Sequence, residues 1–262
     1  MRTLLTSIML CLFVLGSSNV FAQQLSADEI IERANQAAYY AGADGQANVK
    51  MTITAKDGIT RVREFALLRL NEPNGDQKFY TYFKAPADVY KMAYLVWKNL
   101  DDNDDRWLWL PALNLKKRIA PGDKRTSFVG SDFVYEDVSG RSPKEDRHRL
   151  IDRTDDYYVI ENEPVDPSSV EFSRYTVQID AITFLPMLAQ YYDRSGQLYR
   201  KVEALEVVDV QGYPTVTVAQ ASDLVSGSVT RNEFSQVRYD LGLKAKIFTE
   251  RFLRRPPREV TR

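Results

Sequence analysis

The fold is decided by residues 104–141, DDRWLWLPALNLKKRIAPGDKRTSFVGSDFVYEDVSGR, in a chain of 262 residues. This stretch places an aromatic strand, a doubly basic turn and an aromatic-acidic segment in succession. It has neither the nucleophile-base spacing nor the metal-ligand spacing that catalytic sites need. The pattern favours a protein that holds an apolar ligand.

Two strand candidates near the start of this stretch are apolar on both faces. In Arg106–Leu110 the tryptophans 107 and 109 alternate with two leucines, and Ala93–Trp97 has the same character. An antiparallel sheet over a single core alternates apolar and polar faces, so both faces of these strands need a cover. Either packed elements of the chain cover the second face, or that face lines a cavity for an apolar ligand.

The candidates for lining such a cavity are aromatic residues and one methionine on the predicted strands and in the aromatic-acidic segment. They are Phe79, Phe83, Trp97, Trp107, Trp109, Phe133, Met187 and Tyr191.

Outside this stretch, one helix and many strands are expected. Ser26 and Glu29 form a capping-box pattern at the start of a helix that reaches about Tyr40. From Val49 onward the apolar residues alternate, and turns such as Lys56-Asp57-Gly58 separate the runs. About a dozen strands with one good helix predict a mainly β (α+β) fold, either a strongly curved antiparallel sheet or an open, incomplete antiparallel β-barrel.

The first 22 residues read as a secretory signal peptide, with Arg2 before an apolar core and a cleavage site near Ala22. Residues 23–262 are expected to form one secreted domain. Cys11, in the signal, is the only cysteine, so the mature chain has no thiol chemistry. Without Arg2 it has 34 basic and 36 acidic residues, which argues against nucleic-acid binding.

No residue is predicted to be catalytic, and neither a metal nor a cofactor is expected. His148 is the only histidine and is predicted to lie on the surface of a strand. Neither serine motif completes the G-x-S-x-G pattern of a nucleophile elbow: the one around Ser226 lacks the first glycine, and the one around Ser131 lacks the last. A hydrolase is therefore the least favoured class.

A basic loop surrounds Ala120-Pro121-Gly122-Asp123. It is either a docking site for lipid head groups or an acidic partner, or a solvated turn whose cations pair with Asp123, Glu136 and Asp137. The docking candidates are Lys116, Lys117, Arg118, Lys124 and Arg125.

Three segments carry a family resemblance. They are Trp107–Leu113, Lys117–Ile119 and Phe128–Asp137, in which GSDFVYED at 130–137 is the most specific part. Phe83–Asp88 and Tyr191–Asp193 fit the same pattern. With these segments the chain resembles the LolA-like outer-membrane lipoprotein-sorting family, in the branch associated with RND-type exporters. The resemblance implies a LolA/LolB/RseB-type half-barrel around an apolar cavity, with short helices as a lid or plug.

The same resemblance implies a periplasmic carrier or binding protein for a lipid, lipoprotein or other acylated ligand. It also implies an RND-type inner-membrane transporter as partner. Contact with a membrane surface through the basic loop and a monomeric protein are further expectations. The alternative is an accessory or sensor module that docks an exporter or regulator and carries no cargo.

Overall fold

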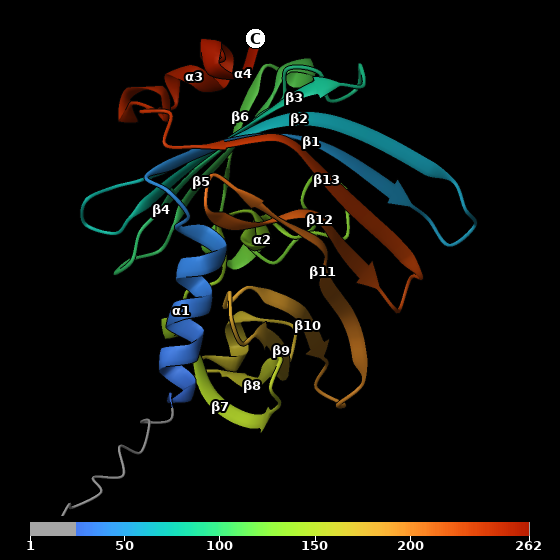
Figure 1. Ribbon diagram of the computed structural model, residues 1–262. Helices are drawn as coiled ribbons and strands as arrows, with labels where there is room; N and C mark the ends of the chain where they lie inside the picture. The colour runs from blue at the N-terminus through green and yellow to red at the C-terminus, as the bar shows by residue number, and fades with distance from the viewer. Residues whose placement is uncertain (1–24, 262) are drawn as a thin grey trace, which may run out of the picture.

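The computed structural model describes residues 25–261, so the predicted signal peptide lies outside the described part of the chain. One antiparallel sheet of 13 strands dominates the molecule (Figure 1). Its spatial order is β6-β5-β4-β3-β2-β1-β13-β12-β11-β10-β9-β8-β7, so β6 and β7 are its two edges. The predicted fold, an open and strongly curved half-barrel, is confirmed.

The first half of the chain supplies β1 (Asp44–Thr54), β2 (Thr60–Asn71), β3 (Gln77–Ala85), β4 (Ala93–Lys98), β5 (Asp105–Leu110) and β6 (Leu115–Ile119). The second half supplies β7 (Asp146–Arg153), β8 (Tyr157–Pro164), β9 (Arg174–Asp180), β10 (Pro186–Tyr192), β11 (Leu198–Val210), β12 (Tyr213–Asp223) and β13 (Ser228–Tyr239). The helices are α1 (Ala27–Tyr39), α2 (Tyr135–Ser139), α3 (Arg251–Arg254) and α4 (Arg258–Thr261).

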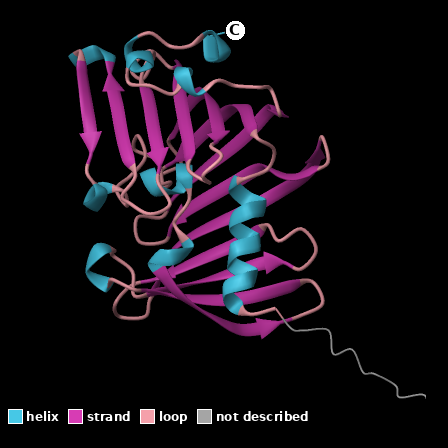
Figure 2. Ribbon diagram, turned by 90° about the vertical axis from the view of Figure 1, so that its left-hand side faces the viewer, coloured by secondary structure: helices cyan, strands magenta, loops and turns pink. Residues whose placement is uncertain are grey.

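Helix α1 begins where the sequence predicts it. The Ser26 hydroxyl accepts a hydrogen bond from the Glu29 amide, and the Glu29 carboxylate accepts one from the Ser26 amide, at 3.2 and 2.8 Å. This capping box satisfies amides that the first turn leaves without partners. The helix buries Ile30 and Ala34 and packs on β7 and β8. It therefore stands beside the concave side of the sheet (Figure 2).

The C-terminal segment, residues 241–261, covers the convex face of β2 to β5 (Figure 1). Its buried side chains Ile247, Phe248, Leu253 and Val260 pack against Tyr80, Leu95, Trp107 and Trp109. The Tyr80 hydroxyl donates to the Phe252 carbonyl at 2.7 Å, and the Trp97 indole donates to the Phe248 carbonyl at 2.8 Å. Aromatic residues with polar tips are thus buried without losing a hydrogen bond.

This cover corrects one step of the sequence argument. The second apolar face of β4 and β5 is covered by the chain's own C-terminal segment and does not line a cavity. Part of the cover comes from helices α3 and α4, which have four residues each and are too short to show a helical period in the sequence.

Candidate ligand cavity

A cavity of about 450 Å³ lies on the concave side of the sheet. Its walls come from α1, from β1 to β3, from β7 and β9 to β13, and from the segment that leads from Phe128 to Pro143. Apolar side chains dominate the walls, as is usual for small-molecule sites of about 300–1,000 Å³. They include Met51, Phe65, Leu67, Val177, Ile179, Val202, Val216, Ala219 and Phe234.

Several of these apolar walls are only partly covered by protein. Leu67, Val202, Ala219 and Phe234 are half-buried, although each packs against a fully buried core. The core beneath them is aromatic, with the rings of Phe65 and Phe128 6.3 Å apart at their centroids. The cavity therefore lies on top of a well-packed aromatic core, and its walls are only partly buried.

The segment Gly130–Asp137 crosses the concave side and acts as a plug between the two halves of the sheet. The Asp132 carboxylate accepts hydrogen bonds from Ser228 and Thr230 on β13, and the Asp137 carboxylate pairs with Arg200 on β11. The motif that carries the family resemblance therefore has a structural role, because it fixes the plug to strands far away in sequence.

Glycine is required where the plug ends. Gly140 has φ +79°, and a Cβ there would lie 2.6 Å from the Tyr39 ring of α1. Any side chain would clash with that ring and would strain the backbone. The close approach lets α1 and α2 meet at the edge of the cavity.

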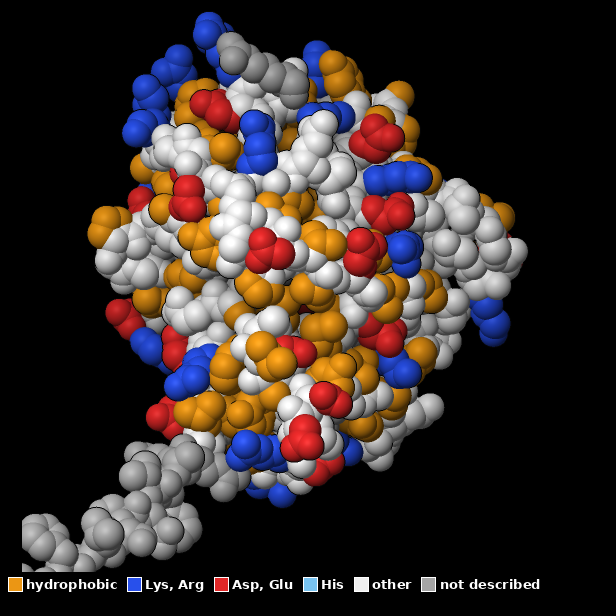
Figure 3. Space-filling view, in the orientation of Figure 1, with side chains coloured by type: hydrophobic (Ala, Val, Ile, Leu, Met, Phe, Trp, Pro, Cys, Tyr) orange, Lys and Arg blue, Asp and Glu red, His pale blue; other side chains and the backbone are white. Residues whose placement is uncertain are grey.

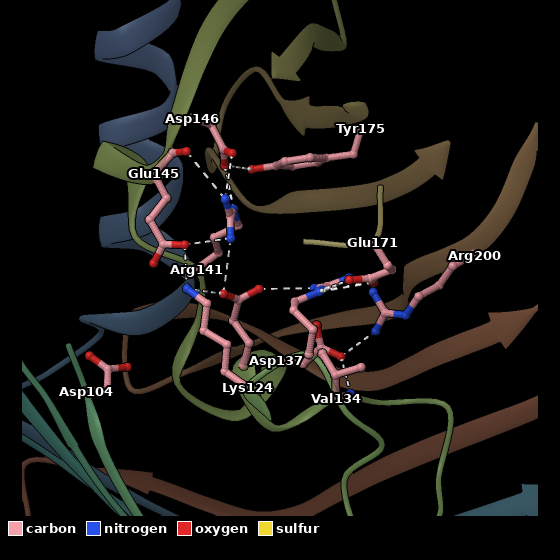
Figure 4. A network of polar contacts seen from close by, with 12 residues as sticks. Asp104, Lys124, Val134, Asp137, Arg141, Glu145, Asp146, Glu171, Tyr175 and Arg200 are labelled. Atoms are coloured by element: carbon pink, nitrogen blue, oxygen red, sulfur yellow. Dashed lines mark hydrogen bonds and ion pairs between the residues drawn. The ribbon is translucent and has the colours of Figure 1, made fainter. Parts of the chain in front are cut away.

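A buried ion network closes one end of the cavity (Figure 4). Glu136 is 2% exposed at its side chain and pairs with Lys124, Arg125 and Arg141 at 3.0, 3.1 and 3.3 Å. Arg141 also binds Glu145 at 2.6 Å and Asp146 at 2.7 Å. The network thus holds the plug, β7 and the loop between them together.

Aromatic rings and further acids complete the network. Arg125 binds Glu171 at 2.7 Å and lies over the rings of Phe172 and Tyr191, 5.1 Å from each centroid. The Tyr175 hydroxyl donates to Asp146 at 2.8 Å. Burial, together with the Asp146 charge, raises the pKa of Tyr175, so the phenol stays protonated as a donor.

Two opposing effects act on Glu136. Burial raises the pKa of its carboxyl, but Arg125, Arg141 and Lys124 outweigh burial and lower the pKa to about 2. The Glu136 carboxylate is therefore charged at neutral pH and compensates the charge of its three cationic neighbours.

The structure brings only some of the predicted lining residues to the cavity. Phe79, Phe133 and Tyr191 line it. Phe83 lies in the core beneath, with its ring 6.0 Å from that of Phe128. The other four lie elsewhere: half-buried Met187 on β10, outside the lining, and Trp97, Trp107 and Trp109 against the C-terminal segment.

The five basic candidates separate into two groups. Lys124 and Arg125 belong to the buried ion network, with side chains 15% and 6% exposed, and do not lie on an accessible surface. The expected pairing with Glu136 is confirmed, but the two cations are buried and do not belong to a solvated turn. Lys116, Lys117 and Arg118 are exposed on edge strand β6.

His148 differs from its expected place on a strand surface. It is half-buried and lines the cavity, with Nδ1 2.7 Å from the Asn162 side-chain oxygen and Nε2 3.0 Å from the Pro143 carbonyl. These two contacts hold the ring against the loop before β7. Among residues 25–261, no group of three or more His, Cys, Asp or Glu side chains forms a metal site.

Sequence reasoning missed most of the walls, including the small side chains Ala37 and Ala38 of α1 and those of β11 to β13. The alternation of Val49, Met51 and Ile53 was a usable signal, because all three belong to the core on the concave side. The cavity rim on β12 and β13 had no such signal, since polar residues such as Asn232 interrupt it.

Known proteins share this architecture. A DUF1329 family protein from Desulfovibrio piger is 29% identical, with a TM-score of 0.80 over 87% of this chain and 97% of that one. A Vibrio parahaemolyticus domain, provisionally described as an outer membrane lipoprotein-sorting protein, is 26% identical, with a TM-score of 0.79 over 87% and 98%. A LolA superfamily protein from Nitrosomonas europaea, 22% identical over 87% and 100%, shares the fold with a TM-score of 0.67.

The open sheet with its plugged concave side thus defines a half-barrel of the LolA/LolB/RseB type. Residues 75–255 match a protein family whose description reads "Uncharacterized protein". The chain belongs to that family, and it is similar in sequence and fold to the DUF1329 protein and to the Vibrio domain described provisionally as lipoprotein-sorting. No protein with a curated description matches the sequence.

The helices of residues 25–261 are all too short for a bilayer span, which takes about 20 residues. The longest, α1, has 13 residues, and none offers an apolar stretch that crosses a membrane.

Proposed function

We propose that the protein is a non-enzymatic periplasmic carrier that holds an apolar chain of a lipid, a lipoprotein or another acylated ligand. The observation that carries this proposal is the cavity of about 450 Å³ whose apolar walls stay partly uncovered by the chain itself. Covering such walls with a ligand contributes about 25 cal/mol per Å² of apolar surface.

The geometry favours an extended apolar ligand over a polar one. Nearly every charged group at the closed end of the cavity already has a partner of opposite charge within the ion network. A charged group of the ligand that entered this end would have to displace one partner of a buried ion pair, which costs several kcal/mol. The ligand's polar group therefore stays toward the open side.

The Vibrio relative, described provisionally as a lipoprotein-sorting domain, supports the choice of an acylated ligand in outer-membrane biogenesis or export. The family resemblance also supports an RND-type inner-membrane transporter as the partner in transfer. Cross-linking in cells followed by mass spectrometry tests that partner directly.

Native mass spectrometry of protein purified from the periplasm tests the carrier function. We expect adducts with lipid masses, which solvent extraction releases and identifies. The purified protein should also enhance the emission of a fatty acid that carries an environment-sensitive fluorophore.

Filling the cavity sharpens the test. Ala189 and Ala219 line the cavity, so the Ala189→Trp and Ala219→Trp variants should no longer carry lipid adducts. Their affinity for the fluorescent fatty acid should fall about tenfold or more. Ala87→Trp places the same side chain on the exposed turn after β3 and should leave both unchanged. Wild-type protein that neither carries lipid nor binds the probe would favour the accessory-module alternative.

A further inference from the structure

One end of the molecule carries a concentrated positive charge. Residues 115–119 and 241–261 hold nine cationic and two acidic side chains, a net charge of +7 in a chain of net charge −1. We call this surface the basic end. Its cations are Lys116, Lys117, Arg118, Lys244, Lys246, Arg251, Arg254, Arg255 and Arg258.

The two segments of the basic end lie side by side. Lys116 on β6 pairs with Glu250, and the Arg254 guanidinium lies over the Trp109 ring of β5, 4.9 Å from its centroid. Figure 2 places the β5–β6 turn and the C-terminal helices at the same end of the molecule. In Figure 3, basic side chains gather at the upper left, over α3.

The cations of the basic end are exposed, while the apolar side chains between them are buried. All six cations of the C-terminal segment are exposed, whereas Phe248 and Leu253 are almost fully buried. Within residues 25–261, only Lys116 and Arg118 of the nine form ion pairs. Seven cations are therefore available to an external anion, and a surface of one sign attracts an oppositely charged partner from a distance.

Two exposed leucines stand at the projecting turn of the same end. Leu113, in the turn between β5 and β6, is 70% exposed, and Leu115 at the start of β6 is 45% exposed. Exposed leucines beside unpaired cations are the pattern of proteins that bind at a lipid interface, where cations meet anionic head groups and apolar residues enter the layer below. An acidic protein partner would account for the charge but not for leucines at the outermost point.

Between β6 and the C-terminal segment lies a hollow of about 380 Å³. Its walls include Trp109, Lys116, Arg251, Arg254 and Arg255. Glu250 also lines the hollow and pairs with Lys116, so three guanidinium groups beside the indole ring, those of Arg251, Arg254 and Arg255, offer hydrogen-bond donors to a phosphate. The indole offers an apolar surface to the glycerol part beside it.

We propose that the basic end docks the protein on an anionic phospholipid bilayer, with Leu113 and Leu115 entering the head-group layer. This surface lies outside the cavity walls, so the docking does not depend on the proposed carrier function. It gives a route by which a carrier approaches the membrane that supplies or receives an acylated ligand.

Vesicle co-flotation of the purified protein tests the docking. We expect binding to vesicles of phosphatidylcholine mixed with phosphatidylglycerol, no binding to phosphatidylcholine alone, and weaker binding as salt rises. A variant with Lys117, Arg251, Arg255 and Arg258 all changed to Gln should lose about tenfold or more in affinity for the mixed vesicles.

The matched control removes the same charge elsewhere. Lys56, Arg147, Arg153 and Arg194 are exposed outside the basic end, and changing all four to Gln should leave vesicle binding near the wild-type level. An equal loss in both variants, or no binding of the wild type to anionic vesicles, would overturn the proposal. In the second case, an acidic protein becomes the occupant to seek.

Substitution of the two leucines tests the docking without altering the charge of the protein. The double variant Leu113→Ser with Leu115→Ser should bind the anionic vesicles several-fold more weakly, and unchanged binding would refute their entry into the lipid layer. Ala189→Trp, which blocks the cavity, should bind vesicles as the wild type does. Failure of docking and failure of ligand binding are therefore told apart.

Discussion

The two faces of the curved sheet bury apolar side chains in different ways. On the convex face of β2 to β5, the C-terminal segment covers the strands so closely that Tyr80 and Leu95 are 0% exposed. On the concave face, Leu67 and Phe234 remain half-buried beside the cavity. An apolar strand face in the sequence shows only that something must cover it. Whether the chain itself covers that face completely or only in part distinguishes a core from a candidate binding site.

The largest expected effect concerns the convex face. Phe248 of the C-terminal segment is fully buried against the convex face, so Phe248→Ala should lower the free energy of unfolding by about 3–5 kcal/mol. Urea unfolding followed by tryptophan fluorescence measures this loss. Leu113→Ala, at an exposed site, should change it by less than about 0.5 kcal/mol. Similar values for the two variants would contradict the assignment of this segment to the core.

The second effect concerns the ion network that closes the concave side. Glu136→Gln keeps the side-chain shape but leaves Lys124, Arg125 and Arg141 with one carboxylate fewer, so stability should fall by about 3 kcal/mol. Urea unfolding measures the change. Glu163→Gln, which removes an exposed charge from β8, serves as the control and should have little effect.

The same carboxyl predicts a pH dependence. The pKa of Glu136 is about 2 in the folded protein against an ordinary value of 4.5, so the unfolded chain binds the proton more readily. The contribution of Glu136 to the free energy of unfolding is fully present above pH 4.5 and is lost as the pH falls from 4.5 toward 2. Over that range the stability of Glu136→Gln should fall less steeply than that of the wild type. Parallel curves would show that another group controls acid unfolding.

The sequence was sufficient for much of the fold because its local signals agree with the structure. The capping box at Ser26 begins α1, and the alternation around Met51 belongs to a strand with one core face. The two-faced character of β4 and β5 was also recognised correctly. The sequence did not predict that the C-terminal segment covers these strands, because the apolar residues of that segment show neither a helical nor a strand period.

The candidate site was less predictable because burial of a charge depends on distant partners. Arg125 looks like part of an exposed basic loop, but Glu171, 46 residues away, and the ring of Phe172 draw it into the interior. His148 is likewise held by Asn162 on the neighbouring strand. Pairings of this kind follow from the curvature of the sheet, which local patterns do not specify.

The smallest stability effect should come from the wall of the cavity. Phe234 on β13 is half-buried, so Phe234→Ala creates less new void than a core substitution and should cost about 1 kcal/mol or less. The same variant should bind the fluorescent fatty acid several-fold more weakly, because the ring is a contact for the ligand. Urea unfolding and a fluorescence titration measure the two quantities. A stability loss as large as that of Phe248→Ala would mean that both faces are packed equally, and the concave side would then be core.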